Sequence, residues 1–524
     1  MVIRRGTRNG LRAMRAVVHS SVWRGRRPAV TLLWVALGIA ACAGPPGGGR
    51  IDADVRDEAQ VAARIRQVEQ GLLPATVIAG RPLPAMPLEE RMRYFNVPGV
   101  SIAVVEDGKI AWAKGYGMAR AGSTRAVDTA TLFQAASISK PVATLGALRL
   151  VEQGRLALDE DVNARLTSWR VPPAEIAGSE LVTLRRIVSH NAGLTVHGFP
   201  GYRRGVHVPT AVQVLTGGPP ANTAAVRIDV VPGSLWRYSG GGFTVAQLLM
   251  SDVTGRPFAE VMEELVLRPI GMASSTYEQP LPDALAARAA TAHDRSGEPI
   301  AGEWHTYPEQ AAAGLWTTPA DLARMIIAVQ RSAAGEAGAL LSPTTAREML
   351  TVQAGSYGLG FGLAGEGDAR RFAHGGSNAG FRALFVGTVT TGKGAVIMTN
   401  ADLGGPLIDE IIRGIAHVYG WTGYEPAQKT IAAIDSATLR GLAGRYRLES
   451  SGAERVLEVV LEGGELRANL PNWLSARTLY AAAPDRYFML ESGLELEFER
   501  DPGGRATAVT VNGGGPPLRA TRID

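Results

Sequence analysis

The sequence predicts a mixed α/β protein that ends in a small all-β domain, and three patterns carry this prediction. Apolar, β-prone runs lie at residues 100–113 and again at 383–399, which places strands near both ends of a long segment. The pattern between these runs is mostly helical. From about residue 438 to 524, short alternating runs are separated by Gly-Gly or Pro-Gly turns. These short runs predict a β-sandwich or a β-barrel.

The first two predicted strands form a hairpin. Val100–Val105 and Ile110–Ala113 flank Asp107-Gly108, a dipeptide that favours a tight turn between strands. A second turn joins the later strands, where Gly387–Lys393 has the spacing of a phosphate-binding loop. Gly394 stands where that loop needs a Ser or Thr for magnesium, and the segment joins two strands rather than a strand and a helix. We therefore expect a hairpin there as well.

The first 42 residues predict export and lipid anchoring. Eight arginines and no acidic residue precede an apolar run, Ala29–Ala41, which is too short to span a bilayer comfortably. The run ends at Cys42, the only cysteine, and Ile39–Cys42 resembles a bacterial lipobox, in which the cysteine is lipidated and becomes the new N-terminus. The alternative is an ordinary signal peptide with an incidental cysteine. A membrane-anchored protein, periplasmic or at the cell surface, is expected.

Composition limits the partners of the remaining chain. Without the eight leader arginines, 46 basic side chains face 49 acidic ones, a net charge of −3, so nothing suggests nucleic acid. Residues 43–50 predict a Gly/Pro-rich tether. Within residues 43–87, apolar residues recur at helical spacing and predict a helix that ends at Gly71. One cysteine excludes a disulfide framework. No metal or cofactor is predicted, since none of the scattered histidines has metal-ligand spacing: His190, His197, His207, His293 and His305.

Ser137 and Lys140 are the candidate nucleophile and base. Residues three apart lie on one face of a helix, so the Lys140 amine can reach the Ser137 hydroxyl and take its proton. The chain contains five lysines against 49 arginines, and it keeps a lysine where only lysine can act as a base. Pro141 is tolerated only if the helix has barely begun, which places Ser137 at its start. The alternative is a serine that only caps the helix.

Two further segments carry candidate site residues. Tyr238 precedes Gly240–Gly242, which predicts a glycine-rich turn, and a phenol beside a lysine cation can shuttle protons. His374 begins a His-Gly-Gly-Ser run whose glycines permit a strand edge with N–H groups that face an oxyanion. Each of these side chains could equally serve ordinary packing.

Taken together, these stretches resemble the serine β-lactamase-like family of class C β-lactamases, DD-peptidases, D-aminopeptidases and related esterases. The resemblance runs from about Leu88 to Tyr419. It rests on Pro98–Val104, Ser137–Lys140, Leu184–Leu194, Tyr238–Gly240, Pro269–Met272, Gly314–Asp321 and His374–Gly376. It implies a mostly antiparallel sheet built from residues 96–118 and 372–400 and flanked by helices, with a helical region inserted between the two. The segment after 438 looks like the C-terminal barrel often appended in this family.

The family scheme implies that Ser137 forms an acyl-enzyme while Lys140 and Tyr238 exchange protons with it and with the leaving group. His374 matches the first position of the Lys/His-Thr/Ser-Gly element, and Gly376 and Ser377 continue that strand along the substrate. The N–H groups of Ser137 and Ser377 would form the oxyanion hole. No cofactor is implied.

Two positions depart from the lactamase pattern. Gly240 stands at the Asn position of Tyr-x-Asn, and Gly375 stands where the family has a Thr or Ser hydroxyl. Both departures argue against β-lactam hydrolysis but not against acyl transfer, although a protonated His374 could still bind a substrate anion.

We therefore predict a hydrolase domain at 88–425, followed by a β-domain at 438–524, that cleaves small ester, amide or peptide substrates. The alternatives are a catalytically silent binding protein of the same fold and a true class C β-lactamase.

Overall fold

The computed structural model describes residues 49–448, 455–470, 474–513 and 516–524. The chain divides into two compact units, residues 1–55 and 56–524. The predicted signal peptide with Cys42 lies outside the described residues, as does most of the tether. Helix α1 (Gly49–Gln70) includes the last two residues of the segment predicted as tether, and it ends before Gly71 as expected. In the described ranges, no helix combines the length and apolarity that crossing a membrane requires.

A six-stranded antiparallel sheet organises residues 88–425. Its order is β3-β2-β11-β10-β9-β8, and every neighbouring pair is antiparallel. The strands are β2 (Gly99–Glu106), β3 (Lys109–Gly117), β8 (Gly362–Ala364), β9 (Arg371–Asn378), β10 (Phe381–Thr388) and β11 (Gly394–Thr399). Strands from both ends of the segment thus meet side by side, which confirms the predicted sheet and both predicted hairpins.

The central strands are buried on both faces. Alternate residues of β2 enter different cores: Ala103 and Val105 pack on one side of the sheet, and Ile102 and Val104 on the other. Because successive side chains of a strand point to opposite faces, a strand covered on both sides reads as a continuous apolar run. This explains why β2 and β11 are mostly apolar.

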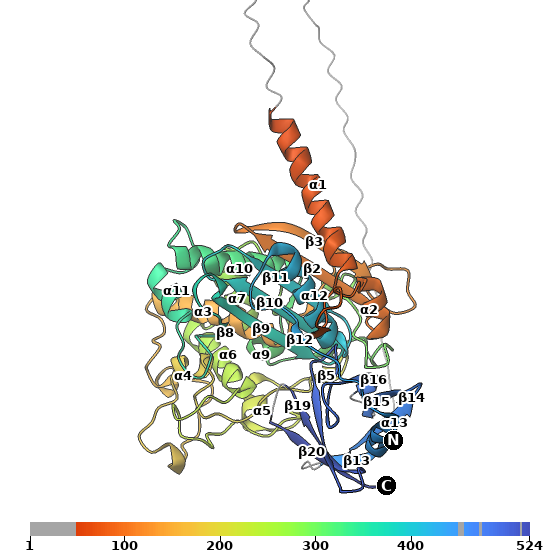
Figure 1. Ribbon diagram of the computed structural model, residues 1–524. Helices are drawn as coiled ribbons and strands as arrows, with labels where there is room; N and C mark the ends of the chain where they lie inside the picture. Colours follow the sequence, from red (N-terminus) through yellow and green to blue (C-terminus); the bar gives the residue numbers. More distant parts are fainter. Residues whose placement is uncertain (1–48, 449–454, 471–473, 514–515) are drawn as a thin grey trace, which may run out of the picture. The chain divides into compact units, whose positions relative to one another are not determined.

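Helices cover both faces of this sheet (Figure 1). Helix α10 (Pro319–Ala334) packs on β2, β10 and β11 from one side, and α12 (Gly404–Tyr419) packs on β10 and β11 from the other. Helix α2 (Leu88–Tyr94) joins the α12 side.

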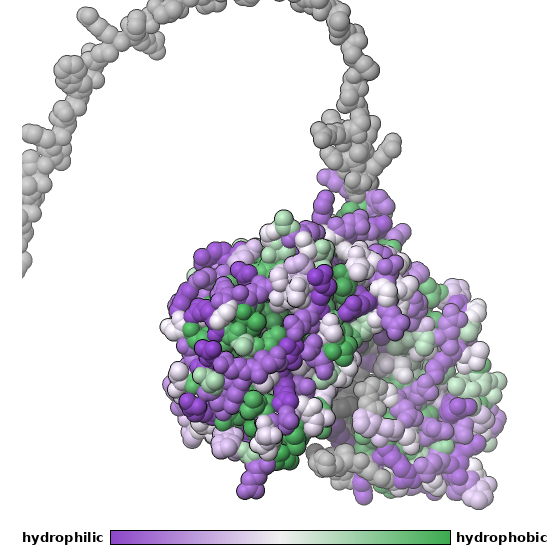
Figure 2. All heavy atoms as spheres, turned by 90° about the vertical axis from the view of Figure 1, so that its left-hand side faces the viewer, coloured by the Kyte–Doolittle hydropathy of each residue, from purple (hydrophilic) through white to green (hydrophobic). Residues whose placement is uncertain are grey.

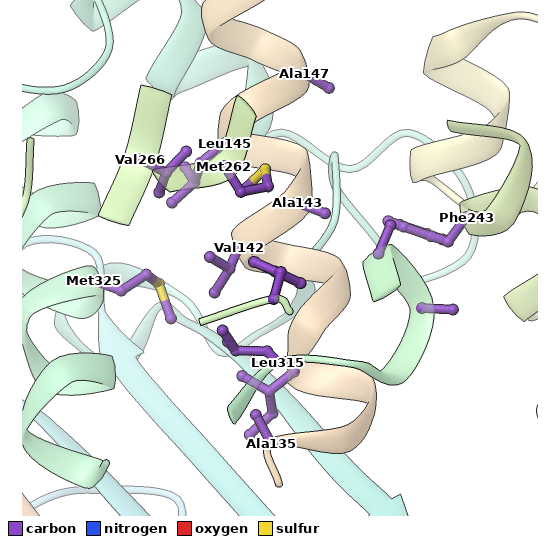
Figure 3. Packing of buried hydrophobic residues seen from close by; sticks show 14 of the residues in the cluster. Ala135, Val142, Ala143, Leu145, Ala147, Phe243, Met262, Val266, Leu315 and Met325 are labelled. Atoms are coloured by element: carbon purple, nitrogen blue, oxygen red, sulfur yellow. The ribbon is translucent and has the colours of Figure 1, made fainter. Parts of the chain in front are cut away.

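Helix α3 (Ser139–Glu152) lies within the α10-side core and is buried along nearly its whole length. Figure 3 shows Val142 and Leu145 of α3 among Met262, Val266, Leu315 and Met325.

The inserted helical region consists of short elements. Its helices are α4 (Leu184–Val188), α5 (Ala211–Thr216), α6 (Gly240–Thr254), α7 (Phe258–Met262), α8 (Asp283–Ala286) and α9 (Gln310–Ala313), and α11 (Pro343–Met349) follows α10. Within the region predicted as mostly helical, α4 spans only five residues, and α7 is followed directly by a π-helical turn, η4 (Glu263–Leu267). Two-stranded ladders join β4 (Phe133–Gln134) to β7 (Trp316–Thr317), β5 (Tyr202–Arg203) to β6 (His305–Thr306), and β1 (Thr76–Ile78) to β12 (Ala427–Lys429).

The C-terminal segment is a closed eight-stranded barrel, which decides between the two predicted β architectures. Its strands are β13 (Gly444–Leu448), β14 (Val456–Glu462), β15 (Glu465–Leu470), β16 (Leu474–Ala481), β17 (Arg486–Phe488), β18 (Glu495–Arg500), β19 (Ala506–Asn512) and β20 (Leu518–Arg522), preceded by α13 (Ser436–Leu442). Side chains that include Tyr446, Leu466 and Phe498 form its own apolar core.

Candidate active site

Ser137 and Lys140 lie together at the start of α3. Ser137 belongs to a short 3-10 turn, η1 (Ala136–Ile138), and α3 begins two residues later than predicted, at Ser139. The Lys140 Nζ lies 3.0 Å from the Ser137 Oγ and donates a second hydrogen bond, of 2.7 Å, to the carbonyl of Ala312. Lys140 is only 2% exposed. A buried amine is thus directed at the partly exposed hydroxyl of Ser137.

A strained backbone turn presents the serine. Ala136 has φ +50°, a left-handed conformation that costs a non-glycine residue free energy. Ser139 holds this turn in place, because its hydroxyl donates to the Ala136 carbonyl and accepts the N–H of Leu315. A strained residue persists only where the surrounding structure holds it in place, and such residues are common at functional turns.

Tyr238 completes the group, on the segment that leads into α6. The Lys140 Nζ lies 4.9 Å from the centre of the Tyr238 ring. The glycines after Tyr238 were predicted to form a turn, and that prediction is wrong: Gly240–Gly242 are the first turn of α6, and the Ser239 hydroxyl caps it by accepting the N–H of Gly242. A serine N-cap satisfies the free N–H groups that a helix start exposes.

A side chain at Gly240 would be crowded. A Cβ atom there would lie 3.0 Å from both the His197 carbonyl oxygen and the Phe199 ring. At Gly241 the Thr195 carbonyl oxygen would lie at 2.6 Å from such an atom. The loop of residues 195–199 therefore packs directly on the position that carries Asn in a Tyr-x-Asn pattern, and glycine is needed for this close approach rather than for a flexible turn.

Strand β9 brings the other predicted site residues against η1. A Cβ atom at Gly376 would lie 2.2 Å from the Ala135 carbonyl oxygen, so only glycine allows the two backbones to meet. At Gly375, by contrast, the only atom near a built Cβ is the Ala383 carbonyl oxygen, at 3.8 Å. Ser377 follows and is exposed. The predicted oxyanion hole of the Ser137 and Ser377 N–H groups stays a prediction.

His374 is held as a neutral side chain. Its Nδ1 donates a 2.6 Å hydrogen bond to the Gly375 carbonyl, while its buried Nε2 has no partner within the described residues. Burial, reinforced by the nearby Lys140 cation, lowers the pKa of His374 to about 3. A neutral imidazole carries no positive charge, which removes the open possibility that a protonated His374 binds a substrate anion near neutral pH.

The sequence did not indicate that a group of aromatic side chains surrounds Tyr238. His190 is 1% exposed and stacks on the Tyr238 ring at 4.2 Å between centres, and its Nδ1 accepts the N–H of Ser239 at 3.1 Å. The other members of this aromatic group are His197, Trp236 and Tyr357. Burial, with a smaller effect of Lys140, lowers the pKa of His190 well below its usual value. These histidines were considered only as metal ligands, although His190 lies within the Leu184–Leu194 motif.

Metal ligation finds no support in the part of the chain that the structure describes, where no three His, Cys, Asp or Glu side chains are grouped to hold an ion.

Glu309 is a second residue that the sequence did not indicate. It directly precedes α9, whose Ala312 carbonyl binds Lys140 and whose Ala313 carbonyl accepts the Asn378 amide at 3.1 Å. The Glu309 side chain is fully buried, and neither carboxyl oxygen has a hydrogen-bond partner within the described residues. Burial raises the pKa of Glu309 to about 7.

Glu309→Gln should therefore change the pH dependence of stability. Below pH 4.5, glutamate is protonated in both the folded and the unfolded chain. As pH rises from 4.5 to about 7, the unfolded chain releases the proton first, so the folded state loses stability, by roughly 3 kcal/mol at pH 8. Glutamine does not titrate. We expect the free energy of unfolding of Glu309→Gln, relative to wild type, to rise by about that amount between pH 5 and pH 8.

Urea unfolding at the two pH values measures this difference. Glu278→Gln, at an exposed carboxyl, is the control and should show the same offset from wild type at both pH values. If the offset of Glu309→Gln from wild type were equal at pH 5 and pH 8, Glu309 would not titrate as described.

Comparison with models of protein families shows to which family the chain belongs. The family model described as Beta-lactamase matches residues 88–419, which is more than half of the chain. The chain belongs to the beta-lactamase family. The match covers the sheet, the inserted helices and all the site residues described above, and it ends before the barrel.

Curated relatives include hydrolases of different kinds. Esterase EstB of Burkholderia gladioli is 29% identical over 219 residues, 40% of this chain and 54% of the esterase. This chain therefore spans about half the length of that relative. Penicillin-binding protein 4* of Bacillus subtilis is 22% identical over 435 residues, which cover 76% of this chain and 89% of that protein.

Among solved structures, the octameric penicillin-binding protein homologue from Pyrococcus abyssi is similar in fold. It has a TM-score of 0.56 and 19% identity, and the alignment covers 82% of this chain and 98% of the other.

Proposed function

We propose that this beta-lactamase family member is an exported, lipid-anchored serine hydrolase that cleaves ester or amide substrates through an acyl-enzyme on Ser137. One observation carries the proposal: the buried Lys140 Nζ lies 3.0 Å from the Ser137 Oγ. A hydroxyl becomes a competent nucleophile when a positioned base within hydrogen-bond reach takes its proton. The curated esterase relative supports the same reaction class.

The geometry supports a two-step reaction. The Lys140 amine, in its unprotonated form, takes the Ser137 proton as the Oγ attacks the substrate carbonyl, and Lys140 and Tyr238 return that proton to the departing alcohol or amine. Water then attacks the acyl-enzyme and gives a proton to the same groups, which pass it to the Ser137 Oγ as the acid is released. The hydrogen bond from Lys140 to the Ala312 carbonyl keeps the amine directed at Ser137 in both steps.

The substrate is expected to be uncharged near the scissile bond. A β-lactam or a peptide C-terminus carries a carboxylate, which the family pattern holds with a hydroxyl that Gly375 lacks. His374 is neutral and offers no replacement charge. At position 240 the packed loop would crowd the amide that touches a penicillin. A lost hydrogen bond to a charged group costs about 1.5–3 kcal/mol, roughly ten- to a hundredfold in binding or rate.

The purified protein should therefore hydrolyse a short-chain 4-nitrophenyl ester with a higher kcat/KM than nitrocefin, with lactam turnover weak or nil. Both rates are measured on one preparation whose active sites are counted with a fluorophosphonate probe. A tenfold preference for nitrocefin would favour a true class C β-lactamase. Absence of both turnover and probe adduct would favour the catalytically silent binding protein.

The anchor is proposed from Cys42 at the end of the Ala29–Ala41 run. A lipidated cysteine would hold the hydrolase at a membrane surface, with the segment before α1 as its tether. Cys42→Ser should move the protein from the membrane fraction to a soluble exported fraction, as detected by immunoblotting of fractionated cells. Ester hydrolysis per molecule should not change. A variant that still sediments with membranes would contradict the lipid anchor.

A further inference from the structure

An exposed apolar surface adjoins the catalytic group. Trp236 is 41% exposed, although its ring lies 6.5 Å from Tyr238 and 5.8 Å from Tyr357. Leu235, beside it, is 48% exposed, and Val352, on the segment that leads to Tyr357, is 55% exposed. The two segments meet where Gly355 packs on Trp236. Large exposed apolar side chains on adjoining segments are typical of a binding surface, whereas isolated ones are not.

The tryptophan is held in position from one side. Gly355 has φ +57°, and a Cβ atom there would lie 3.3 Å from the Trp236 Cβ and Cγ atoms. The turn of residues 354–357 therefore packs closely on Trp236, and the rings of Tyr238 and His190 lie beside it, while 41% of the residue stays exposed to solvent. A ring fixed in this way binds an apolar partner without losing much conformational freedom.

Figure 2 views the side of the molecule on which α4 and α11 lie in Figure 1, and it shows apolar patches among hydrophilic side chains there. The segment with Val352 and Gly355 directly follows α11.

We infer that Leu235, Trp236 and Val352 form a binding site for an apolar, preferably aromatic or medium-chain, group of the ester substrate whose carbonyl reacts with Ser137. This inference rests on the proposed function and names its substrate class. The Tyr238 ring lies within 4.9 Å of the Lys140 Nζ and is the neighbour of Trp236, so it links the reacting group to the apolar site. An acetyl group reaches less far from the reacting carbonyl than a hexanoyl chain or a phenyl ring does, so we expect only the longer groups to contact Trp236.

The surroundings of this site fit an uncharged group. The Trp236 ring lies beside the rings of Tyr238, Tyr357 and His190, and both His190 and His374 stay neutral near neutral pH because burial lowers the pKa of each. Tryptophan offers a large flat apolar face on which another ring stacks favourably. Each methylene group removed from water on this surface should add up to about fourfold to kcat/KM.

The test compares two substrate series on the wild type and on Trp236→Ala and Trp236→Phe. The first series pairs 4-nitrophenyl acetate with 4-nitrophenyl hexanoate, and the second pairs methyl acetate with benzyl acetate. In the wild type, the larger apolar substrate should be preferred in at least one series. Trp236→Ala should reduce that preference in kcat/KM by tenfold or more, mainly through KM, and Trp236→Phe should keep most of it.

The control is Leu83→Ala, at another exposed apolar side chain, which should leave both preferences unchanged. Counting active sites with a fluorophosphonate probe corrects for any misfolded fraction, and Trp236→Phe retains an aromatic ring if the alanine variant does not fold. The inference would be overturned if both Trp236 variants keep the wild-type preference to within twofold. It would also be overturned if the wild type itself prefers the larger substrate in neither series. Both outcomes leave the hydrolase intact. A wild type that cleaves no ester and takes no probe would instead overturn the proposed function.

Discussion

Ser137→Ala should lower ester hydrolysis by about 10⁴-fold or more without unfolding the protein. The substitution removes the oxygen that forms the acyl-enzyme, and the neighbouring Ser139 hydroxyl cannot take its place, because it is buried and bound to the Ala136 carbonyl. The structural cost is small, since Ser137 is partly exposed and neither the cap of η1 nor that of α3 uses its side chain. The measurement is kcat/KM for a short-chain nitrophenyl ester.

A fluorophosphonate probe and a thermal melt separate loss of chemistry from loss of fold. The wild type should take one probe molecule per chain and Ser137→Ala none, while the two melting temperatures agree closely. Ser296→Ala, at an exposed serine away from η1, is the matched control and should keep both turnover and labelling. Hydrolysis at the wild-type rate by Ser137→Ala would refute Ser137 as the nucleophile.

The parts of the fold that depend on local patterns could be predicted from the sequence. The Asp107-Gly108 turn and the apolar runs beside it predict the β2–β3 hairpin, and Pro141 correctly limits how far α3 can extend toward Ser137. The Ser137–Lys140 pair lies within one turn of chain, so its spacing alone brings the hydroxyl and the amine together. Only the resemblance implied that the two distant strand segments form one sheet, because pairing between β2 and β11 joins residues nearly 300 positions apart.

The errors and omissions have a common physical origin in contacts between distant segments. Glycines at 240–242 predict a turn when only their flexibility is considered, but here their small size lets residues 195–199 pack on the start of α6. His190 stacks on Tyr238, and Glu309 becomes buried directly before α9, only after the inserted helices fold back onto α3. No periodicity or spacing in the sequence records such contacts.

Lys140→Arg should lower kcat by about 10²- to 10⁴-fold, the range expected for loss of a general base. Guanidinium stays protonated in proteins, so arginine cannot take the Ser137 proton even though it keeps the positive charge and can still donate to the Ala312 carbonyl. Lys140→Met, which keeps a similar chain length but no charge, should lose as much activity. If the charge alone mattered, the arginine variant would retain most of the rate and the methionine variant would not.

Lys114→Arg is the matched control, at a lysine whose side chain is 48% exposed and paired with Glu69, and it should leave kcat unchanged. Single-turnover acylation by a nitrophenyl ester isolates the step in which Lys140 acts, because the release of nitrophenol reports attack by Ser137 directly. The acylation rate of Lys140→Arg should fall together with kcat, while the reaction of Lys114→Arg follows the wild type. An arginine variant that acylates at more than a tenth of the wild-type rate would require another base for Ser137, and the nearest candidate is Tyr238, whose ring lies beside the same Nζ position.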